Sequence, residues 1–242
     1  MRRASRDAEA PARGTASRAV DAGAARRVRA LYRRLLQRYG PQGWWPADDR
    51  FEMMVGAVLV QNTAWRNAQH AVAGLRDAGL LQWRRLAQAR EDRIADAIRA
   101  AGTYRVKARR VAALARHVAA HGGPQALAAL PTPALRAGLL RVHGVGAETA
   151  DAILVYAYAR PSFVLDAYTR RVCARLGFAP TAAPHADAAL RELLEGALPR
   201  DAALYGEFHA LIVAHARVSC RARPRCAGCA LHAHCPFAAG EC

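Results

Sequence analysis

The stretch LPTPALRAGLLRVHGVGAETADAILVYA, residues 130–157, decides the fold. Apolar residues recur at helical spacing on both sides of His143-Gly144-Val145-Gly146, and the two glycines there indicate a tight turn. The stretch therefore predicts two helices, 133–141 and 147–159, joined as a helix-hairpin-helix. Glycines at both turn positions expose backbone N–H groups beside the start of the second helix, where a phosphate can dock without a side-chain charge. An ordinary short turn between two helices is the alternative interpretation.

Helical patterns extend on both sides of this hairpin, from about residue 28 almost to the C-terminus. In AARRVRALYRRLLQRYG, Val28, Leu31, Leu35 and Leu36 follow helical spacing up to a stop at Gly40. The alternating β-branched runs that are typical of strands do not occur. The fold class is therefore predicted to be all-α, with two helical lobes and a cleft between them. Further helices are expected over residues 51–62, 65–77, 91–101, 106–121, 167–177, 186–197 and 202–217.

The charge balance is strongly basic. The chain has 36 Lys and Arg against 19 Asp and Glu, for a formal net charge of +17, and Lys107 is its only lysine. Such a surplus of cations favours a polyanionic partner such as DNA, because neutralised phosphates release counterions. GC-rich coding sequence produces the same arginine-rich, lysine-poor composition, and charge alone does not separate the two explanations.

Residues 1–27 form a basic tail with seven arginines and three acidic residues, which is +4 of the total charge. The tail has almost no large apolar side chain, so we expect it to be disordered. No apolar segment follows its arginines as in a secretory signal, and no apolar run of the chain approaches the length of a membrane span. These features predict a bacterial cytoplasmic protein, associated with the nucleoid, whose cysteines stay reduced.

Four cysteines near the C-terminus follow the spacing C-x5-C-x2-C-x5-C: Cys220, Cys226, Cys229 and Cys235. In a reducing compartment, clustered soft ligands of this kind indicate a metal site more often than disulfides. The compact spacing suits a [4Fe–4S] cluster better than a zinc ribbon, which separates two C-x2-C pairs by a long insert. Zinc is the alternative, and free thiols are a more distant one. Cys173 lies in an apolar stripe and is predicted to belong to the core, and Cys242 is assigned no role.

Asp166 follows the apolar residues Phe163, Val164 and Leu165 and precedes a predicted helix. A carboxylate at the mouth of an apolar pocket can stabilise a developing oxocarbenium ion on a sugar, or orient a water for attack on it. Asp is also a preferred helix N-cap, and taken alone the position favours the cap. The two roles are geometrically compatible.

In this order, the hairpin, Asp166 and the cysteine loop resemble the helix-hairpin-helix DNA glycosylases of the endonuclease III superfamily, over about residues 28–238. Two further segments, VLVQNTAWRNA (58–68) and GTYRVKARRV (102–111), are similar to segments of that family. The resemblance implies that Gln61 fills the duplex gap left by a flipped base and that Asp166 is the catalytic carboxylate. The residues expected to contact the DNA are Gln61, His143, Gly144, Val145 and Gly146.

The resemblance also implies how the chain is divided. An N-terminal helix, within residues 28–50, is expected to pack with the C-terminal lobe. Residues 51–160 are expected to form a six-helix lobe that includes the hairpin, 133–159. Residues 161–242 are expected to form the C-terminal lobe, with the cluster loop at 220–235.

Glu148 aligns with the lysine by which bifunctional family members form a Schiff base with the sugar and cleave the strand. A carboxylate cannot form an imine, and Lys107 lies in another segment, so the resemblance implies a monofunctional enzyme without lysine-based lyase activity. An acid in the first turn of a helix is also favoured by the helix dipole. Glu148 is therefore either a surface acid or part of the base pocket. The first gap between cysteines is one residue shorter than in endonuclease III, which keeps zinc or an absent cluster as alternatives.

Trp44-Trp45-Pro46, with Trp65 after Gln61-Asn62-Thr63, resembles the pocket of the family branch that excises 3-methyladenine. An alkylated purine is cationic and its glycosidic bond is already weakened. Indole faces stack well on cationic rings, at roughly 0.5–2 kcal/mol per contact. Tryptophans of an ordinary core are the alternative. The predicted base pocket consists of Trp44, Trp45, Pro46, Trp65 and Glu148.

These features together predict a monofunctional DNA glycosylase of base excision repair. It would flip a damaged base, expected to be an alkylated purine, out of double-stranded DNA and hydrolyse its N-glycosidic bond. We expect the protein to be a monomer. An endonuclease III-like glycosylase with AP lyase activity, and a non-catalytic protein that binds damaged DNA, are the alternatives. The missing lysine disfavours the first, and the presence of Asp166 and Gln61 disfavours the second.

Overall fold

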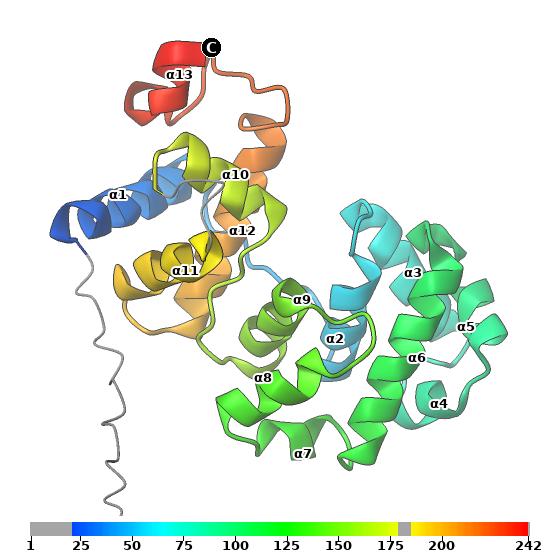
Figure 1. The fold of residues 1–242 in the computed structure, drawn as a ribbon. Coiled ribbons are helices and arrows are strands. Elements are labelled where there is room, and N and C mark those ends of the chain that lie inside the picture. The colour runs from blue at the N-terminus through cyan, green and yellow to red at the C-terminus, as the bar shows by residue number, and fades with distance from the viewer. Residues whose placement is uncertain (1–20, 179–184, 242) are drawn as a thin grey trace, which may run out of the picture.

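The computed structural model of the chain describes residues 21–178 and 185–241, and every regular element in these ranges is helical, as predicted. Figure 1 shows two groups of helices, with α2–α9 in one lobe and α1 and α10–α13 in the other. No helix in the described ranges is long and apolar enough to cross a membrane. The first lobe contains α2 (Arg50–Leu59), α3 (Trp65–Asp77), α4 (Trp83–Gln88), α5 (Glu91–Ala97), η1 (Arg99–Ala101), α6 (Tyr104–Ala120), α7 (Pro124–Ala128), α8 (Thr132–Leu140), α9 (Ala147–Ala152) and η2 (Ile153–Ala157). The second contains α1 (Ala22–Tyr39), α10 (Ala167–Arg175), α11 (Ala186–Gly196), α12 (Ala202–Val218), η3 (His232–His234) and α13 (Pro236–Glu241).

The first lobe is built around α2 and α6. Every residue of α2 from Met53 to Leu59 is buried, which its almost continuous apolar sequence explains. α4 and α5 pack against α6, and α3 packs against α2 and η1. The hairpin helices α8 and α9 belong to this lobe, and buried residues of both contribute to its core. The hairpin turn is therefore mounted on a packed support.

The second lobe brings the N-terminal helix against the C-terminal ones. α1 packs against α11 and α12, and buries Ala25, Val28, Leu31 and Leu35 in their shared core. The expectation of disorder through residue 27 is wrong for residues 21–27, because Asp21 caps α1 by accepting from the backbone N–H groups of Gly23 and Ala24. Residues 1–20 of the predicted tail lie outside the described ranges.

Asp151 on α9 joins the two lobes. Its side chain is fully buried, and Oδ1 accepts from Arg136 Nε on α8 at 2.8 Å and from Ser162 Oγ at 2.9 Å. Oδ2 accepts from Arg191 Nη2 on α11 at 2.7 Å. Both carboxylate oxygens are therefore occupied by donors from different helices, so this carboxylate stabilises the junction.

Candidate active site

Asp166 follows the lobe junction around Asp151 and Ser162 in the chain, and it stands at the start of α10. It is 7% exposed, and its Oδ1 accepts from the backbone N–H of Thr169 at 2.6 Å, so the predicted N-cap role is confirmed. The other oxygen, Oδ2, lies 3.5 Å from Nε2 of His209 on α12. One carboxylate oxygen thus fixes the side chain to its helix, while the other faces a histidine from the opposite side.

The surroundings of Asp166 favour its ionised form. Burial alone raises the pKa of this carboxyl, but His209 and the donors of Thr169 outweigh it and hold the pKa below its usual value of 3.8. The carboxyl is consequently a carboxylate at neutral pH. A buried carboxylate with one oxygen left outside the helix cap can stabilise developing positive charge or accept a proton.

Glu148 stands in the first turn of α9 and is exposed to solvent. Partial desolvation by the surrounding protein and then the negative charge of Asp166 raise its pKa, while Arg170 and His209 act in the opposite direction. Glu148 therefore senses the charge of Asp166, and the pKa values of the two carboxyl groups are shifted in opposite directions. Glu148 belongs to the surroundings of Asp166.

The hairpin turn has the predicted glycine geometry. Gly144 has a φ of +83°, and a Cβ there would lie 2.3 Å from Cγ of Arg110, so no larger residue fits without displacing that side chain. Gly146 is exposed and caps α9 without a side chain. His143 is exposed as well, but Val145 is buried and its N–H donates to the carbonyl of Val142 at 3.0 Å. The Val145 amide is therefore already used within the turn.

Gln61 is bound to this turn. Its Nε2 donates to the carbonyl of Gly144 at 3.0 Å and to Thr149 Oγ1 at 2.9 Å, and its Oε1 accepts from Arg110 Nη1 at 2.6 Å. The residue predicted to enter the duplex is thus next to the residues predicted to hold the backbone. Arg110 and Thr149 were missed by the sequence analysis, since neither stands out from the helix that contains it.

Three of the predicted pocket residues form one aromatic cluster. The ring centroids of Trp44 and Trp65 are 4.2 Å apart, and those of Trp45 and Trp65 are 4.9 Å apart. A cavity of about 150 Å³ beside them is lined by Trp45, Pro46 and Trp65, but its lining includes neither Asp166 nor Glu148. The rings of Trp44 and Trp65 must separate before a base can stack between them. A base in that position forms two stacked pairs, each with a centroid spacing of roughly 4.5 Å or more, whereas the two indoles are now 4.2 Å apart.

Tyr156 connects the aromatic cluster with Asp166. It lies in η2, a single π-helical turn, and its ring centroid is 5.7 Å from that of Trp45. On its other side, the Tyr156 hydroxyl lies 2.7 Å from Nδ1 of His209. Sequence reasoning missed both Tyr156 and His209, because each stands in a mainly apolar helical stretch and resembles a core residue.

Lys107 forms its hydrogen bonds with residues of the first lobe and not with Asp166. It is 2% exposed, and Nζ donates to the carbonyls of Leu59 at 2.7 Å and of Ala101 at 2.8 Å. Burial, and then the charge of Arg110, lower its pKa to about 8. Lys107 therefore ties the end of α2, just before Gln61, to η1.

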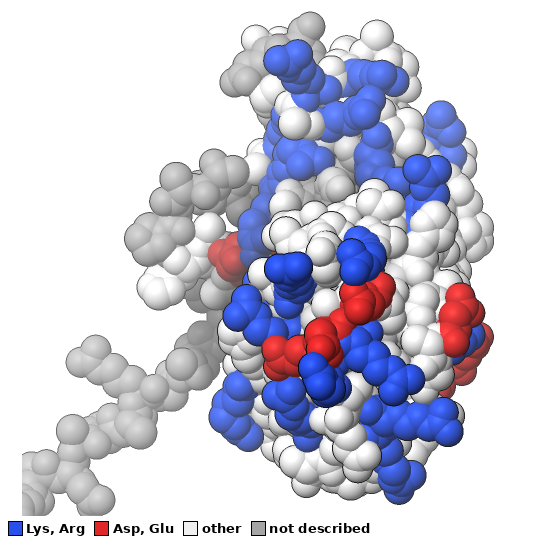
Figure 2. Space-filling model, turned by 90° about the vertical axis from the view of Figure 1, so that its right-hand side faces the viewer, with Lys and Arg blue, Asp and Glu red and all other residues white. Residues whose placement is uncertain are grey.

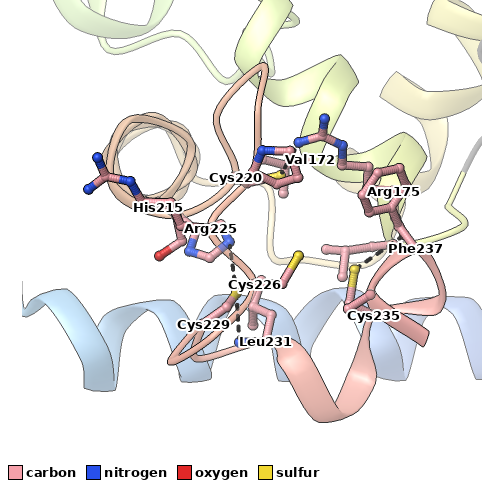
Figure 3. A pocket seen from close by; sticks show the side chains of 14 residues that line it. Val172, Arg175, His215, Cys220, Arg225, Cys226, Cys229, Leu231, Cys235 and Phe237 are labelled. Carbon is pink, nitrogen blue, oxygen red and sulfur yellow. Dashed lines mark hydrogen bonds between the residues drawn. The ribbon is translucent and has the colours of Figure 1, made fainter. Parts of the chain in front are cut away.

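The four cysteines of the C-terminal loop line a single cavity (Figure 3). Apolar side chains, among them Val172, Leu176 and Phe237, complete its wall. Two sulfurs already have donors: Arg175 Nη1 lies 3.3 Å from Cys220 Sγ, and the N–H of Leu231 lies 3.5 Å from Cys229 Sγ. Within the described residues, no three His, Cys, Asp or Glu side chains are grouped as they would be around one metal ion. Cys173 is buried in the core, as predicted, and Cys242 lies outside the described residues.

Positive charge is spread widely over the surface. Figure 2 shows a face on which blue Lys and Arg side chains extend from one end of the molecule to the other, around small red groups of acidic residues. Several arginines are partly neutralised locally, as in the ion pairs of Arg76 with Asp48 and Glu52 at 2.8 Å. The net charge of +17 is therefore not concentrated in one segment.

Comparison with known families identifies the fold and the class of protein. Residues 55–199 match the family described as HhH-GPD superfamily base excision DNA repair protein, and this match includes the hairpin and Asp166. The chain therefore belongs to the HhH-GPD superfamily and is one of its base excision repair DNA glycosylases.

Individual relatives cover most of the chain. A Methanocaldococcus jannaschii protein named "Putative DNA repair glycosylase" is 41% identical over 208 residues, 85% of this chain and 94% of that protein. Endonuclease III of Thermotoga maritima is 30% identical over 190 residues, 78% of this chain and 84% of the relative. Among solved structures, the 3-methyladenine DNA glycosylase of H. pylori bound to 1,N6-ethenoadenine has a TM-score of 0.68 and 26% identity, covering 80% of this chain and 97% of that one. An endonuclease III–DNA complex has a TM-score of 0.75 at 20% identity, covering 89% of this chain and 96% of that one, and supports the fold alone.

Proposed function

We propose that the protein is a monofunctional DNA glycosylase that removes alkylated purines from double-stranded DNA. The observation that carries this proposal is the environment of Asp166, which is buried and ionised, and whose nearby titratable groups include the carboxyl of Glu148 and no lysine amine. The only lysine of the chain is buried in the first lobe with its Nζ on two backbone carbonyls. No lysine amine is therefore available to attack the sugar at this site.

Asp166 would act on the N-glycosidic bond. As the bond to the base breaks, positive charge develops on the sugar, and a fixed carboxylate stabilises that charge more in the transition state than in the ground state. Oδ2, the oxygen that is not used in the cap, can also orient the attacking water and accept its proton. Hydrolysis of this kind leaves an abasic site in an uncut strand, and without an imine the strand is not cleaved.

The aromatic cluster supports a cationic purine as the leaving base. Three indoles, from Trp44, Trp45 and Trp65, lie in mutual contact, and Tyr156 connects them to the surroundings of Asp166. A cation over an indole face is stabilised electrostatically, whereas an uncharged base gains only ordinary stacking. The likeness to the H. pylori 3-methyladenine DNA glycosylase, at 26% identity, agrees with this choice of substrate.

DNA is the proposed partner, with the hairpin on its backbone. The exposed residues His143 and Gly146, with Gly144 between them, would face the phosphates at the start of α9, and Gln61 would enter the duplex where the base has left. Val145 would contribute through the shape of the turn, because its side chain and its amide are both occupied. One copy of the chain contains all these residues, and we propose that the protein acts as a monomer.

We propose further that Cys220, Cys226, Cys229 and Cys235 hold a [4Fe–4S] cluster. The donor set fits, because four cysteine side chains line one mostly apolar cavity and N–H donors already point at two of the sulfurs. A cubane uses one thiolate per iron, so its ligands need not converge as they do on a single zinc ion. The cluster would order the arginine-rich loop between Cys220 and Cys226.

The metal content of the purified protein tests this assignment. We expect iron and acid-labile sulfide, with an absorbance at about 400 nm. Stoichiometric zinc without sulfide would contradict this assignment.

The activity can be tested on duplex oligonucleotides that each carry one lesion, namely an alkylated purine, an oxidised pyrimidine or a mismatch. We expect release of the alkylated purine, and strand breaks only after hot alkali converts the abasic sites. Release of no base, or release of oxidised pyrimidines alone, would contradict the proposed substrate.

A second candidate activity is glycosylase with AP lyase, as the 30% identity to endonuclease III suggests. A lyase cleaves the strand without alkali, and borohydride traps its covalent intermediate. If borohydride traps the parent protein on DNA, the monofunctional proposal is wrong and this second activity takes its place.

A further inference from the structure

His209 on α12 is held in one orientation by Tyr156. The Tyr156 hydroxyl donates to the carbonyl of Gly206 at 2.9 Å and lies 2.7 Å from His209 Nδ1. Gly206 permits this approach, because a Cβ at this position would lie 3.0 Å from Cε1 of Tyr156. The π-helical turn of η2 brings the tyrosine to this place, and such turns are frequent at functional sites.

The hydrogen bonds assign the state of the histidine ring. A tyrosine hydroxyl has one proton, and here it is donated to Gly206, so His209 Nδ1 must donate its own proton to the Tyr156 oxygen. Burial, and then the charges of Asp166 and Glu207, raise the pKa of Tyr156 well above its usual value, so the hydroxyl keeps its proton. This leaves Nε2, which is buried, has no hydrogen-bond partner among the described residues, and lies 3.5 Å from Asp166 Oδ2.

We propose that His209, oriented by Tyr156, is a positioning residue that keeps Asp166 ionised and aimed at the sugar. The proposal rests on the proposed function, in which Asp166 is the reacting carboxylate. With Nδ1 already protonated, a lone pair on Nε2 would repel Asp166, whereas a proton on Nε2 attracts it. The histidine therefore acts as the counter-ion of the catalytic carboxylate.

The groups around the pair explain why a counter-ion is needed. Asp166 is 7% exposed, and Glu148 on α9 places a second carboxyl group close to it. Burial opposes ionisation of Asp166, and the charge of Asp166 in turn raises the pKa of Glu148. The other charged or titratable groups around the pair are Arg170 and Cys173 on α10, Tyr156 on η2, and Glu207 on α12 itself. Arg170 is bound to Asp187 through two hydrogen bonds of 2.8 Å, which leaves His209 as the cation directly at Asp166.

The test is the pH profile of base excision by variants of this pair. Release of 3-methyladenine from methylated duplex DNA is measured under single-turnover conditions for the parent, H209Q, H209N and Y156F. Glutamine can place an amide donor near the position of Nε2 but cannot be charged, whereas asparagine cannot reach it. Y205F is the matched control, because the Tyr205 hydroxyl also donates to a backbone carbonyl, that of Glu195 at 3.1 Å, but does not contact His209.

The expected result is a shift of the acidic limb of the profile. A charge this close lowers the pKa of a carboxyl group by about 1–3 units, so its loss in H209Q should move the half-maximal rate up by about that amount. At pH 8 the H209Q rate should recover most of the parental value, and H209N should be slower than H209Q at every pH. Y156F should show a smaller shift in the same direction, and Y205F none. An H209Q profile parallel to that of the parent would overturn the proposal.

A second measurement separates this proposal from the proposed function. Imidazole ¹H–¹⁵N spectra report directly whether Nε2 of His209 carries a proton and whether its signal changes in D166N. We expect a proton on Nε2 and a change of its signal in D166N, where the carboxylate that faces it is lost. An unprotonated Nε2 at pH 6 would overturn the proposal even if excision proceeds. A parent protein that releases no base would refute the proposed function, and the spectra would still decide the His209–Asp166 pair.

Discussion

Two buried aspartates, Asp151 and Asp166, stand fifteen positions apart and have opposite kinds of surroundings. Asp151 is completely buried, and two arginines and a serine hydroxyl occupy both of its oxygens. Asp166 uses one oxygen to cap α10, and the other has only a histidine at 3.5 Å. A carboxylate with all its acceptor positions filled can stabilise a fold but has nothing left for a substrate. This incomplete bonding is the reason why we propose Asp166, and not Asp151, as the reacting carboxylate.

The largest effect is expected for D166N. Asparagine is as good a helix cap as aspartate, so thermal stability should stay near that of the parent. The rate of base excision should fall by about 10²- to 10⁴-fold, because the amide carries no charge to stabilise the sugar cation. Single-turnover excision and a melting curve on the same preparation check both parts. A rate equal to the parental one would remove Asp166 from the mechanism.

D151N should produce the opposite pattern. It leaves Arg136 and Arg191 without their shared carboxylate, and breaking a buried ion pair costs about 3 kcal/mol or more. We expect the decrease in the free energy of unfolding to lie at the lower end of this range, because both arginines are partly exposed. Denaturant unfolding measures this loss, and excision per folded molecule should stay close to that of the parent. If D151N were folded but as inactive as D166N, the different roles assigned to the two aspartates would be wrong.

A smaller effect is expected for Trp44. Replacing it by alanine removes one indole face from the proposed pocket, and a cation–π contact of roughly 0.5–2 kcal/mol corresponds to roughly 2- to 30-fold in the affinity for a cationic base. An uncharged lesion should be affected less. Competition by free alkylated and unalkylated purines measures this difference. Equal losses for both kinds of base would indicate that Trp44 serves only packing.

The smallest effect concerns Lys107, a buried group whose Nζ donates to two backbone carbonyls. Burial lowers the pKa of Lys107 in the folded protein to about 8, whereas a lysine in the unfolded chain has a pKa of about 10.4. Between these values the unfolded chain binds the extra proton, so this group makes the unfolding free energy rise with pH. Urea unfolding at about pH 8 and pH 10 should show a larger increase for the parent than for K107M. An equal increase for both proteins would contradict the lowered pKa.

The sequence predicted the helices that have room for a periodic pattern. The helix expected over 65–77 is α3, and those expected over 186–197 and 202–217 differ from α11 and α12 by one residue at an end. α4 and α7 were missed, because elements of six and five residues are too short for an apolar period and are held by packing. The helix expected over 147–159 is divided into α9 and the π turn η2, for which the sequence contains no signal.

The candidate site was predictable where a residue stands out in its own segment. Asp166, Gln61 and the hairpin glycines do so, because an acid before a helix or a glycine pair in a turn is visible in the sequence. Tyr156 and His209 lie 53 positions apart, and their contact exists only because η2 meets α12. Neither residue has a local pattern that distinguishes it from the core. The counter-ion of Asp166 is therefore a tertiary feature of the fold.

The three hydrogen bonds of Gln61 have a consequence for the search along undamaged DNA. The insertion proposed for Gln61 requires it to leave Gly144, Thr149 and Arg110, and each such bond contributes about 0.5–1.5 kcal/mol net. This cost is the same at every base pair, whereas the cost of opening the pair is smaller at a damaged one. In the proposed mechanism, Gln61 would leave intact duplex undisturbed while it is bound to the hairpin, and its insertion would become favourable only where the helix is already weak. The protein would then pass sound base pairs without inserting this side chain.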